Sequence, residues 1–153
     1  MKKINKFLML AMIGIFALAF SNCSKDDDPS IDEEELIGGW EIISSKGWEI
    51  EDGVKREWNL TDPISEEHLE RWYFYEDNTF TYNDYYMGRW YESDRGNYEI
   101  KGNKLILMGY DYVYEEEIDE LTIVSLTGNQ LVLRTQQNEP DYKSDIECKY
   151  KRL

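Results

Sequence analysis

Turn signals recur along this chain at intervals too short for long helices, and they separate brief runs rich in Tyr, Trp, Ile and Leu. The clearest turns are Glu51-Asp52-Gly53, Glu76-Asp77-Asn78, Lys101-Gly102-Asn103 and Thr127-Gly128-Asn129. Short apolar runs with such spacing are typical of a β-sandwich or β-barrel. Composition agrees, because all 12 Tyr and all five Trp follow residue 22 whereas no Ala does. Ala favours helices, while Tyr and Trp fit pleated, half-buried surfaces.

These runs predict an all-β domain. We expect strands near Trp40–Ser45, Val54–Leu60, Arg71–Tyr75, Thr79–Tyr85, Trp90–Glu92, Asn97–Lys101, Lys104–Met108, Glu117–Leu126, Gln130–Gln136 and Ser144–Arg152. The stretch from Asp62 to Glu70 is polar and predicts one or two helical turns, capped by Thr61 or Ser65. Helices do not alternate with the strands, so a parallel sheet is not expected.

Residue parity assigns the side chains of these strands to two faces of the sheet. The side chains that share a face opposite charged neighbours are Trp40, Ile42, Trp72, Phe74, Phe80, Tyr82, Tyr98, Ile100, Leu105, Leu107, Leu121, Ile123, Leu131, Leu133, Ile146, Cys148 and Tyr150. In the last strand Glu147, Lys149 and Lys151 face the other way. Cys148 is therefore predicted to be an interior thiol that packs as a small hydrophobic side chain.

The first 22 residues differ from the rest of the chain. Lys2, Lys3 and Lys6 precede an apolar run from Phe7 to Phe20. This run is shorter than the roughly 20 residues that span a bilayer as a helix. A basic start, an apolar run and then small polar residues are typical of a secretory signal peptide. We therefore expect residues 1–22 to be a signal peptide, the alternatives being a transmembrane anchor or a buried helix.

Phe20-Ser21-Asn22-Cys23 resembles the lipoprotein box of bacteria, with Phe20 where Leu is usual. The resemblance implies that Cys23 becomes the first residue and carries acyl chains such as palmitate, which anchor it in a membrane; several chains on one Cys hold it stably. Ser24 to Asp28 resembles the acidic signal that directs some Gram-negative lipoproteins to the outer face of the outer membrane. We expect residues 23–35 to be an acidic tether and 36–153 the folded domain. The alternatives are a secreted protein with one N-terminal Cys and a plain solvated linker.

The charge balance limits the partners of the domain. Beyond residue 22 the chain has 14 basic and 32 acidic side chains, a net charge of −18. Nucleic acid is not an expected partner, because each phosphate contact requires a cation. If Cys23 is acylated, only Cys148 remains and an intrachain disulfide cannot form.

The sequence offers little catalytic chemistry. His68 is the single His and lies in a polar stretch, without the spacing of a zinc site or a nucleophile motif. The acidic runs Asp26–Asp28, Glu33–Glu35 and Glu115–Glu117 lack the pattern of a calcium loop and are interpreted as solvated charge. We therefore expect no metal, no cofactor and no enzyme, with a two-carboxylate glycosidase as the alternative.

Three stretches resemble lipocalin-like proteins found among bacterial surface lipoproteins. Leu36 to Ile42 carries the Gly-x-Trp opening, Phe74 to Thr81 a family hairpin with Asn78 in place of Gly, and Gly96 to Leu107 the strand pair that follows. The resemblance covers Leu36 to Leu153 and implies an up-and-down antiparallel barrel of about eight strands with an apolar cup. It further implies that Trp40 closes one end of the barrel.

A late-strand Arg stacks on that Trp in the family, and the inward parity of Arg152 predicts that it fills this role. The alternative is a frayed C-terminal Arg in solvent. The aromatic side chains predicted to contact a ligand in the cup are Trp58, Phe74, Tyr82, Trp90 and Tyr98.

The sequence favours two functions. The first is a binding protein that holds a small apolar or amphipathic molecule in a cavity of roughly 300 Å³ or more. The second is an envelope protein that contacts a protein partner or a carbohydrate. Its surface would come from the aromatic excess, namely Trp48, Trp58, Tyr85, Tyr86, Trp90, Tyr91, Tyr110, Tyr112 and Tyr114. The alternative for these aromatics is cross-strand packing.

Overall fold

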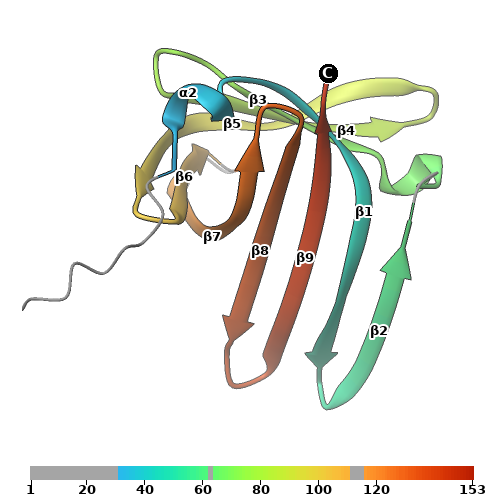
Figure 1. Ribbon diagram of the computed structural model, residues 1–153. Coiled ribbons are helices and arrows are strands. Elements are labelled where there is room, and N and C mark those ends of the chain that lie inside the picture. The colour runs from blue at the N-terminus through green and yellow to red at the C-terminus, as the bar shows by residue number, and fades with distance from the viewer. Residues whose placement is uncertain (1–30, 62–63, 111–115) are drawn as a thin grey trace, which may run out of the picture.

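The computed structural model describes residues 31–61, 64–110 and 116–153 (Figure 1). In this part the chain forms a short helix, one 3₁₀ turn and nine strands. They are α2 (Glu33–Leu36), η1 (Glu66–His68), β1 (Gly38–Glu51), β2 (Val54–Leu60), β3 (Glu70–Phe74), β4 (Thr79–Tyr86), β5 (Arg89–Lys101), β6 (Lys104–Tyr110), β7 (Glu116–Thr127), β8 (Gln130–Asn138) and β9 (Tyr142–Arg152).

The strands form one antiparallel sheet that closes on itself. From β3 to β9 each strand pairs with the next one in the sequence, β1 pairs with β3, and β9 pairs back with β1. The eight strands β1 and β3–β9 therefore make a closed barrel, which confirms the predicted up-and-down barrel of about eight strands. Closure reduces the free sheet edges that would otherwise attract other chains, although β2 pairs with β1 on one side and remains an edge strand in the described part of the chain.

The barrel is longer on one side than on the other. The first part of β1, Gly38–Glu41, pairs with β3, whereas Ser45–Glu51 pairs with β2. In the same way β8 pairs with β7 only as far as Arg134 but continues beside β9 to Asn138. Figure 1 shows the result: β8, β9, β1 and β2 lie side by side and extend past the other strands. These four strands therefore form a wall on one side of the open end of the barrel.

The core fills the opposite end of the barrel. Its fully buried side chains include Trp40, Phe74, Phe80, Leu36 and Leu105. Phe74 meets Tyr98 edge to face at 5.2 Å between ring centroids, a favourable aromatic geometry. The inward side chains predicted from parity line this core or the cavity beside it. Large aromatics thus supply most of the volume that plugs this end.

Turn chemistry is as the sequence predicts at the β3–β4 hairpin. Asn78 adopts a left-handed backbone with φ of 62°, the conformation for which the family hairpin uses Gly. The Asp77 carboxylate accepts hydrogen bonds from the backbone and the hydroxyl of Thr79. These contacts hold the pKa of Asp77 below its usual value.

Several element boundaries differ from the sequence predictions. The strands predicted at Trp90–Glu92 and Asn97–Lys101 are one strand, β5, whose bulge at Ser93 interrupts the apolar pattern. β1 continues past Ser45 to Glu51 because β2 and β9 pair with it on both sides. In the described part of the predicted helical stretch, residues 64–70, the one helical element is the 3₁₀ turn Glu66–His68, and Glu70 begins β3 instead.

The structure describes residues 31–35 of the predicted tether. Asp32 caps α2, since its Oδ1 accepts a hydrogen bond from the Glu34 amide at 3.1 Å. Leu36 ends the helix fully buried, and Ile31 packs against the core. These apolar residues pull the end of an otherwise acidic segment onto the barrel. Within the described ranges, the helices are too short or too polar to cross a membrane.

Candidate functional site

A cavity of about 980 Å³ opens at the extended end of the barrel. Its walls come from β1, β2, β3, β4, β8 and β9, together with the η1 turn and Leu121 of β7. Apolar side chains on its wall include Ile42, Trp58, Leu60, Leu133 and Ile146. The volume lies within the roughly 300–1,000 Å³ typical of small-molecule sites. The predicted cavity is therefore present, and the barrel is hollow at this end.

A carboxylate lies deep in this mostly apolar cavity. Glu70 begins β3, and its Oε2 accepts a hydrogen bond from the Tyr82 hydroxyl at 2.7 Å. Its other oxygen, Oε1, accepts from the Tyr150 hydroxyl, which in turn accepts from Trp72 Nε1 at 3.3 Å. Three strands, β3, β4 and β9, thus converge on one acidic group. The cup is consequently not the purely apolar one that the family resemblance implies.

The environment of Glu70 opposes its ionisation. Burial raises the pKa of Glu70 above its ordinary value of 4.5, and the charge of Asp84 acts in the same direction. The two tyrosine hydroxyls stabilise the carboxylate and lower the pKa, but burial has the larger effect. Burial and the neighbouring Glu70 also raise the pKa of both Tyr82 and Tyr150, so these hydroxyls remain protonated donors.

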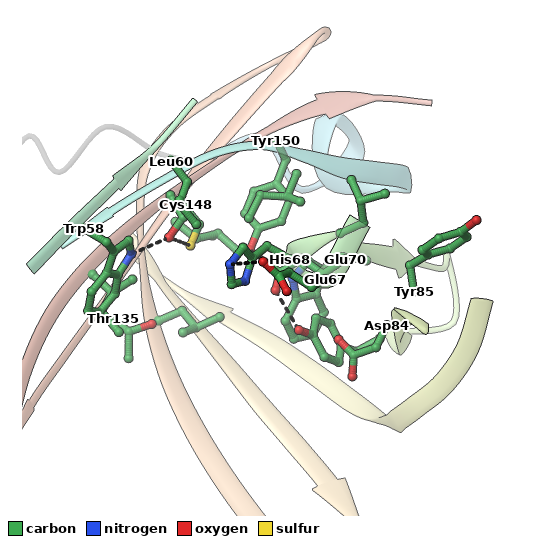
Figure 2. Close-up of a pocket in the computed structure, with 18 of the residues that line it drawn as sticks. Trp58, Leu60, Glu67, His68, Glu70, Asp84, Tyr85, Thr135, Cys148 and Tyr150 are labelled. Atoms are coloured by element: carbon green, nitrogen blue, oxygen red, sulfur yellow. Dashed lines mark hydrogen bonds and ion pairs between the residues drawn. The ribbon is translucent and has the colours of Figure 1, made fainter. Parts of the chain in front are cut away.

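Asp84 is a second acid on this wall. It is the register partner of Glu70 across the β3–β4 pair, and its Oδ2 accepts a hydrogen bond from Ser93 Oγ at 2.6 Å. Ser93 reaches this position because it is the extra residue of the β5 bulge. Figure 2 shows Asp84 and Tyr85 at one side of the cavity and Trp58 and Thr135 at the other.

The opposite wall carries a small polar group of its own. Ser45 Oγ accepts a hydrogen bond from Trp58 Nε1 at 3.1 Å and lies 3.5 Å from Cys148 Sγ. Burial raises the pKa of the Cys148 thiol, which favours its neutral form. Cys148 faces inward as parity predicts and is a free thiol on the cavity wall.

The closed end is held by Arg152 and Trp40. The Arg152 guanidinium lies over the Trp40 ring, 4.4 Å from its centroid, and donates through Nη1 to the Ile37 carbonyl at 2.8 Å. It also donates to the carbonyls of Glu35 and Gly128. Trp40 Nε1 donates to the Leu36 carbonyl at 2.8 Å. This geometry is that of a stacked, multiply bonded Arg and not of a frayed one.

Gly38 explains why the opening motif begins with Gly. Its φ is +127°, and a Cβ at this position would lie 2.8 Å from Arg152 Nη1. The backbone conformation disfavours any other residue, and the space is already occupied by the guanidinium. The motif is therefore a steric requirement of the Arg152 contact.

Two of the five side chains predicted to contact a ligand lie on the cavity wall, namely Trp58 and Tyr82. Phe74 and Tyr98 have the predicted inward parity but pack in the solid core beyond the cavity floor. Trp90 is on the outer face, where the Arg71 guanidinium lies 3.9 Å from its ring centroid. The β5 bulge changes the parity of that strand, which is why the position of Trp90 differs from the prediction.

The remaining residues singled out in the sequence are His68, the acidic runs, Cys23 and two tyrosines. His68 has a side chain 48% exposed at the cavity rim, with Nε2 3.7 Å from Glu67 Oε1. In the described ranges, His, Cys, Asp and Glu form no group of three or more that could hold a metal ion. Cys23, Tyr112 and Tyr114, with the runs Asp26–Asp28 and Glu115, lie outside the described residues.

Sequence reasoning missed Glu70 and Asp84. The sequence prediction places Glu70 in a helical turn, although this residue shares the parity of Trp72 and Phe74 and so faces inward once β3 begins there. Asp84 likewise shares the parity of Phe80 and Tyr82. Parity alone could therefore have identified both acids, whereas their partners on β9 and β5 depend on the closed sheet.

Comparison with known proteins identifies a family for this chain. The sequence profile of the lipocalin-like domain matches residues 36–133. A search of curated proteins gave no match. A lipocalin-like protein from Bacteroides uniformis is 14% identical, with 78% of this chain and 99% of that chain covered and a TM-score of 0.46. The bovine lipocalin allergen Bos d 2 is 13% identical, with 80% and 76% covered and a TM-score of 0.46. Bovine odorant-binding protein, solved in complex with a selenium-containing odorant, is 16% identical, with 85% and 78% covered and a TM-score of 0.44.

Proposed function

Because this chain belongs to the lipocalin-like domain family, we propose that it binds one small apolar or amphipathic molecule inside its barrel. The observation that carries the proposal is the cavity of about 980 Å³ at the extended end. A barrel packed solid at both ends would have no room for a ligand. Here one end is plugged by aromatic side chains, while the other is hollow and lined by Trp58, Leu60 and Ile146.

The test is a titration of the purified protein with phenylnaphthylamine, a neutral apolar dye that becomes fluorescent when it leaves water. We expect saturable binding of one dye per chain. Replacing Trp58 by Ala removes a wall of the cavity and should weaken binding about tenfold, which corresponds to about 1.4 kcal/mol.

The matched control is Trp48→Ala. Trp48 belongs to the same β1–β2 hairpin but lies on the outer face, where Lys55 Nζ is 5.6 Å from its ring centroid. We expect dye binding unchanged in this variant. Absence of saturable binding in the parent protein, or equal loss in both variants, would overturn the assignment of the cavity.

We further propose that the chain is an outer-membrane lipoprotein anchored through acylated Cys23 and exposed at the cell surface. Support comes from the sequence, namely the basic start, the apolar run Phe7–Phe20 and the lipoprotein box at Phe20 to Cys23. Cells that express the protein should incorporate labelled palmitate into it. Cys23→Ala should abolish labelling, while Cys148→Ala, which removes the other Cys, should retain it. Labelling that survives Cys23→Ala would exclude this anchor.

A protein-contact function is the second candidate, and exposed aromatics at the β4–β5 turn favour it. Tyr86 is 62% and Met87 79% exposed, and Tyr91 is also exposed nearby. Exposed apolar side chains of this kind mark many recognition surfaces. Crosslinking in intact cells from this hairpin should capture an envelope partner if this function holds, and Tyr86→Ser should reduce the capture.

A glycosidase receives limited support from Glu70 and Asp84, which are paired acids in one cavity. Both oxygens of Glu70 accept hydrogen bonds from tyrosines, which fix the position of this carboxylate. Turnover of aryl glycosides that disappears in Glu70→Gln would be required to establish such an enzyme.

A further inference from the structure

The charges inside the cavity point to the kind of ligand it takes. Five of its lining residues are acidic, whereas Arg56 is the one Lys or Arg among the residues that line it. Arg56 donates to Glu49 at 2.9 Å and to Glu51 at 3.0 Å, so its charge is already matched by two carboxylates. The cavity therefore has an excess of negative charge that the protein itself does not neutralise.

This excess is concentrated at Glu70 and Asp84. In the described part of the chain neither forms an ion pair with Lys, Arg or His. By contrast, Glu41 on the outer face of the barrel pairs with both Arg71 and Lys151. A buried carboxylate loses the favourable interaction with water that it has in solution. A cationic ligand in the cavity would compensate this loss, because it would form the ion pair that the protein does not provide.

The surroundings of Glu70 suit a cationic group better than a neutral donor alone. Tyr82 and Tyr150 hold the carboxylate from two strands and present aromatic rings beside it. The Trp72 ring is tilted against the Tyr82 ring, with 4.4 Å between ring centroids and 43° between the ring planes. Aromatic rings attract cations through their negative faces, and an ionised carboxylate among such rings strengthens this attraction.

We propose that the cavity selects amphipathic molecules with a positively charged group, such as an alkylammonium, which lies against Glu70 while the apolar part contacts Trp58 and Leu60. This inference rests on the ligand-binding function proposed above and names the chemical class that the site takes. The groups that face Glu70 are Tyr82 and Asp84 from β4, Tyr150 and Cys148 from β9, and Trp72 from β3, with His68 and Glu67 on the same cavity wall. This set contains no Lys or Arg, and His68 lies at the rim of the cavity.

The test compares three probes with the same dodecyl chain: dodecyltrimethylammonium, dodecanol and dodecanoate. Each probe is titrated into the complex of the protein with phenylnaphthylamine, and displacement of the dye is measured. The titrations are done at neutral pH and below the critical micelle concentration of the probe. We expect the ammonium to bind about tenfold more tightly than the alcohol, and the carboxylate more weakly than both. Glu70→Gln should remove the preference, so that the ammonium and dodecanol bind this variant with similar affinity.

Glu99→Gln serves as the matched control, because Glu99 is an exposed acid that pairs with Lys101 at 2.9 Å on the surface. It makes the same change in net charge and should keep the selectivity of the parent protein. Asp84→Asn is a second variant inside the cavity, which keeps the test usable if Glu70→Gln folds poorly, and it should halve the preference or reduce it further.

The outcomes separate the two proposals. If dodecanol and the dye bind but the ammonium shows no advantage, the charge selectivity is wrong and the binding function stands. If Glu99→Gln reduces the preference as much as Glu70→Gln, the effect comes from the net charge of the surface and the assignment of Glu70 is overturned. If neither the dye nor any probe binds, the binding function itself fails.

Discussion

Arg152→Ala is the most informative single test of how the barrel is held shut. The side chain belongs to the penultimate residue of the chain, yet it stacks on Trp40 and donates to the carbonyls of Ile37, Glu35 and Gly128. It therefore connects the last strand to the segment between α2 and β1. Removing it should destabilise the whole domain.

The magnitude follows from these contacts. The two part-buried hydrogen bonds are each worth about 1.5–3 kcal/mol because the donor is charged, and the stacking adds about 0.5–2 kcal/mol. One side chain cannot contribute the full sum, because its contacts depend on one another. We expect a loss of about 3 kcal/mol in the free energy of unfolding, or a fall of about 10 °C in Tm for a domain of this size.

Urea and thermal unfolding, followed by tryptophan fluorescence, measure the effect. Lys151→Ala is the matched control, since the neighbouring side chain is 53% exposed and makes a surface ion pair with Glu41 at 3.1 Å. That variant should lose less than about 1 kcal/mol. A change of less than about 0.5 kcal/mol in Arg152→Ala, no larger than that of an ordinary surface substitution, would refute the reasoning and show that this Arg does not close the barrel.

Three further outcomes are expected. Trp40→Ala should lower the free energy of unfolding by about 3–5 kcal/mol because Trp40 is fully buried, while dye affinity at low temperature stays unchanged; equal loss in unfolding and binding assays would contradict this. Gly38→Ala should cost about 2 kcal/mol in urea unfolding, since strain at its φ of +127° and a clash with Arg152 add together, whereas Gly53→Ala, with open space around its Cβ, should cost less. Burial raises the pKa of Glu70 above 4.5, so the folded state binds a proton that the unfolded state releases. The free energy of unfolding should therefore fall as pH rises from 4.5 through the folded pKa. This fall should be smaller in Glu70→Gln, and an identical pH profile of unfolding in both proteins would rule out the assignment.

Local patterns in the sequence determined the architecture of the domain. Period-two alternation assigned the faces of the strands, and turn residues such as Asn78 located the hairpins, because both depend on backbone geometry within a few residues. The closing role of Trp40 and an Arg partner for it were implied by the resemblance to lipocalin-like proteins, and the parity of the last strand assigned Arg152 to that role. In β5, where the prediction was wrong, a bulge shifts parity by one residue.

Only the tertiary structure decided the character of the cavity. Glu70 is an ordinary charged residue in the sequence, and its surroundings arise because β3, β4 and β9 meet when the sheet closes. The hollow end likewise forms because β1 extends past β3 and β8 extends past β7. The register between the paired strands sets how far they extend. Contacts between residues 80 positions apart, such as Glu70 and Tyr150, leave no local signal, because the energy that selects them is released only when the whole barrel assembles.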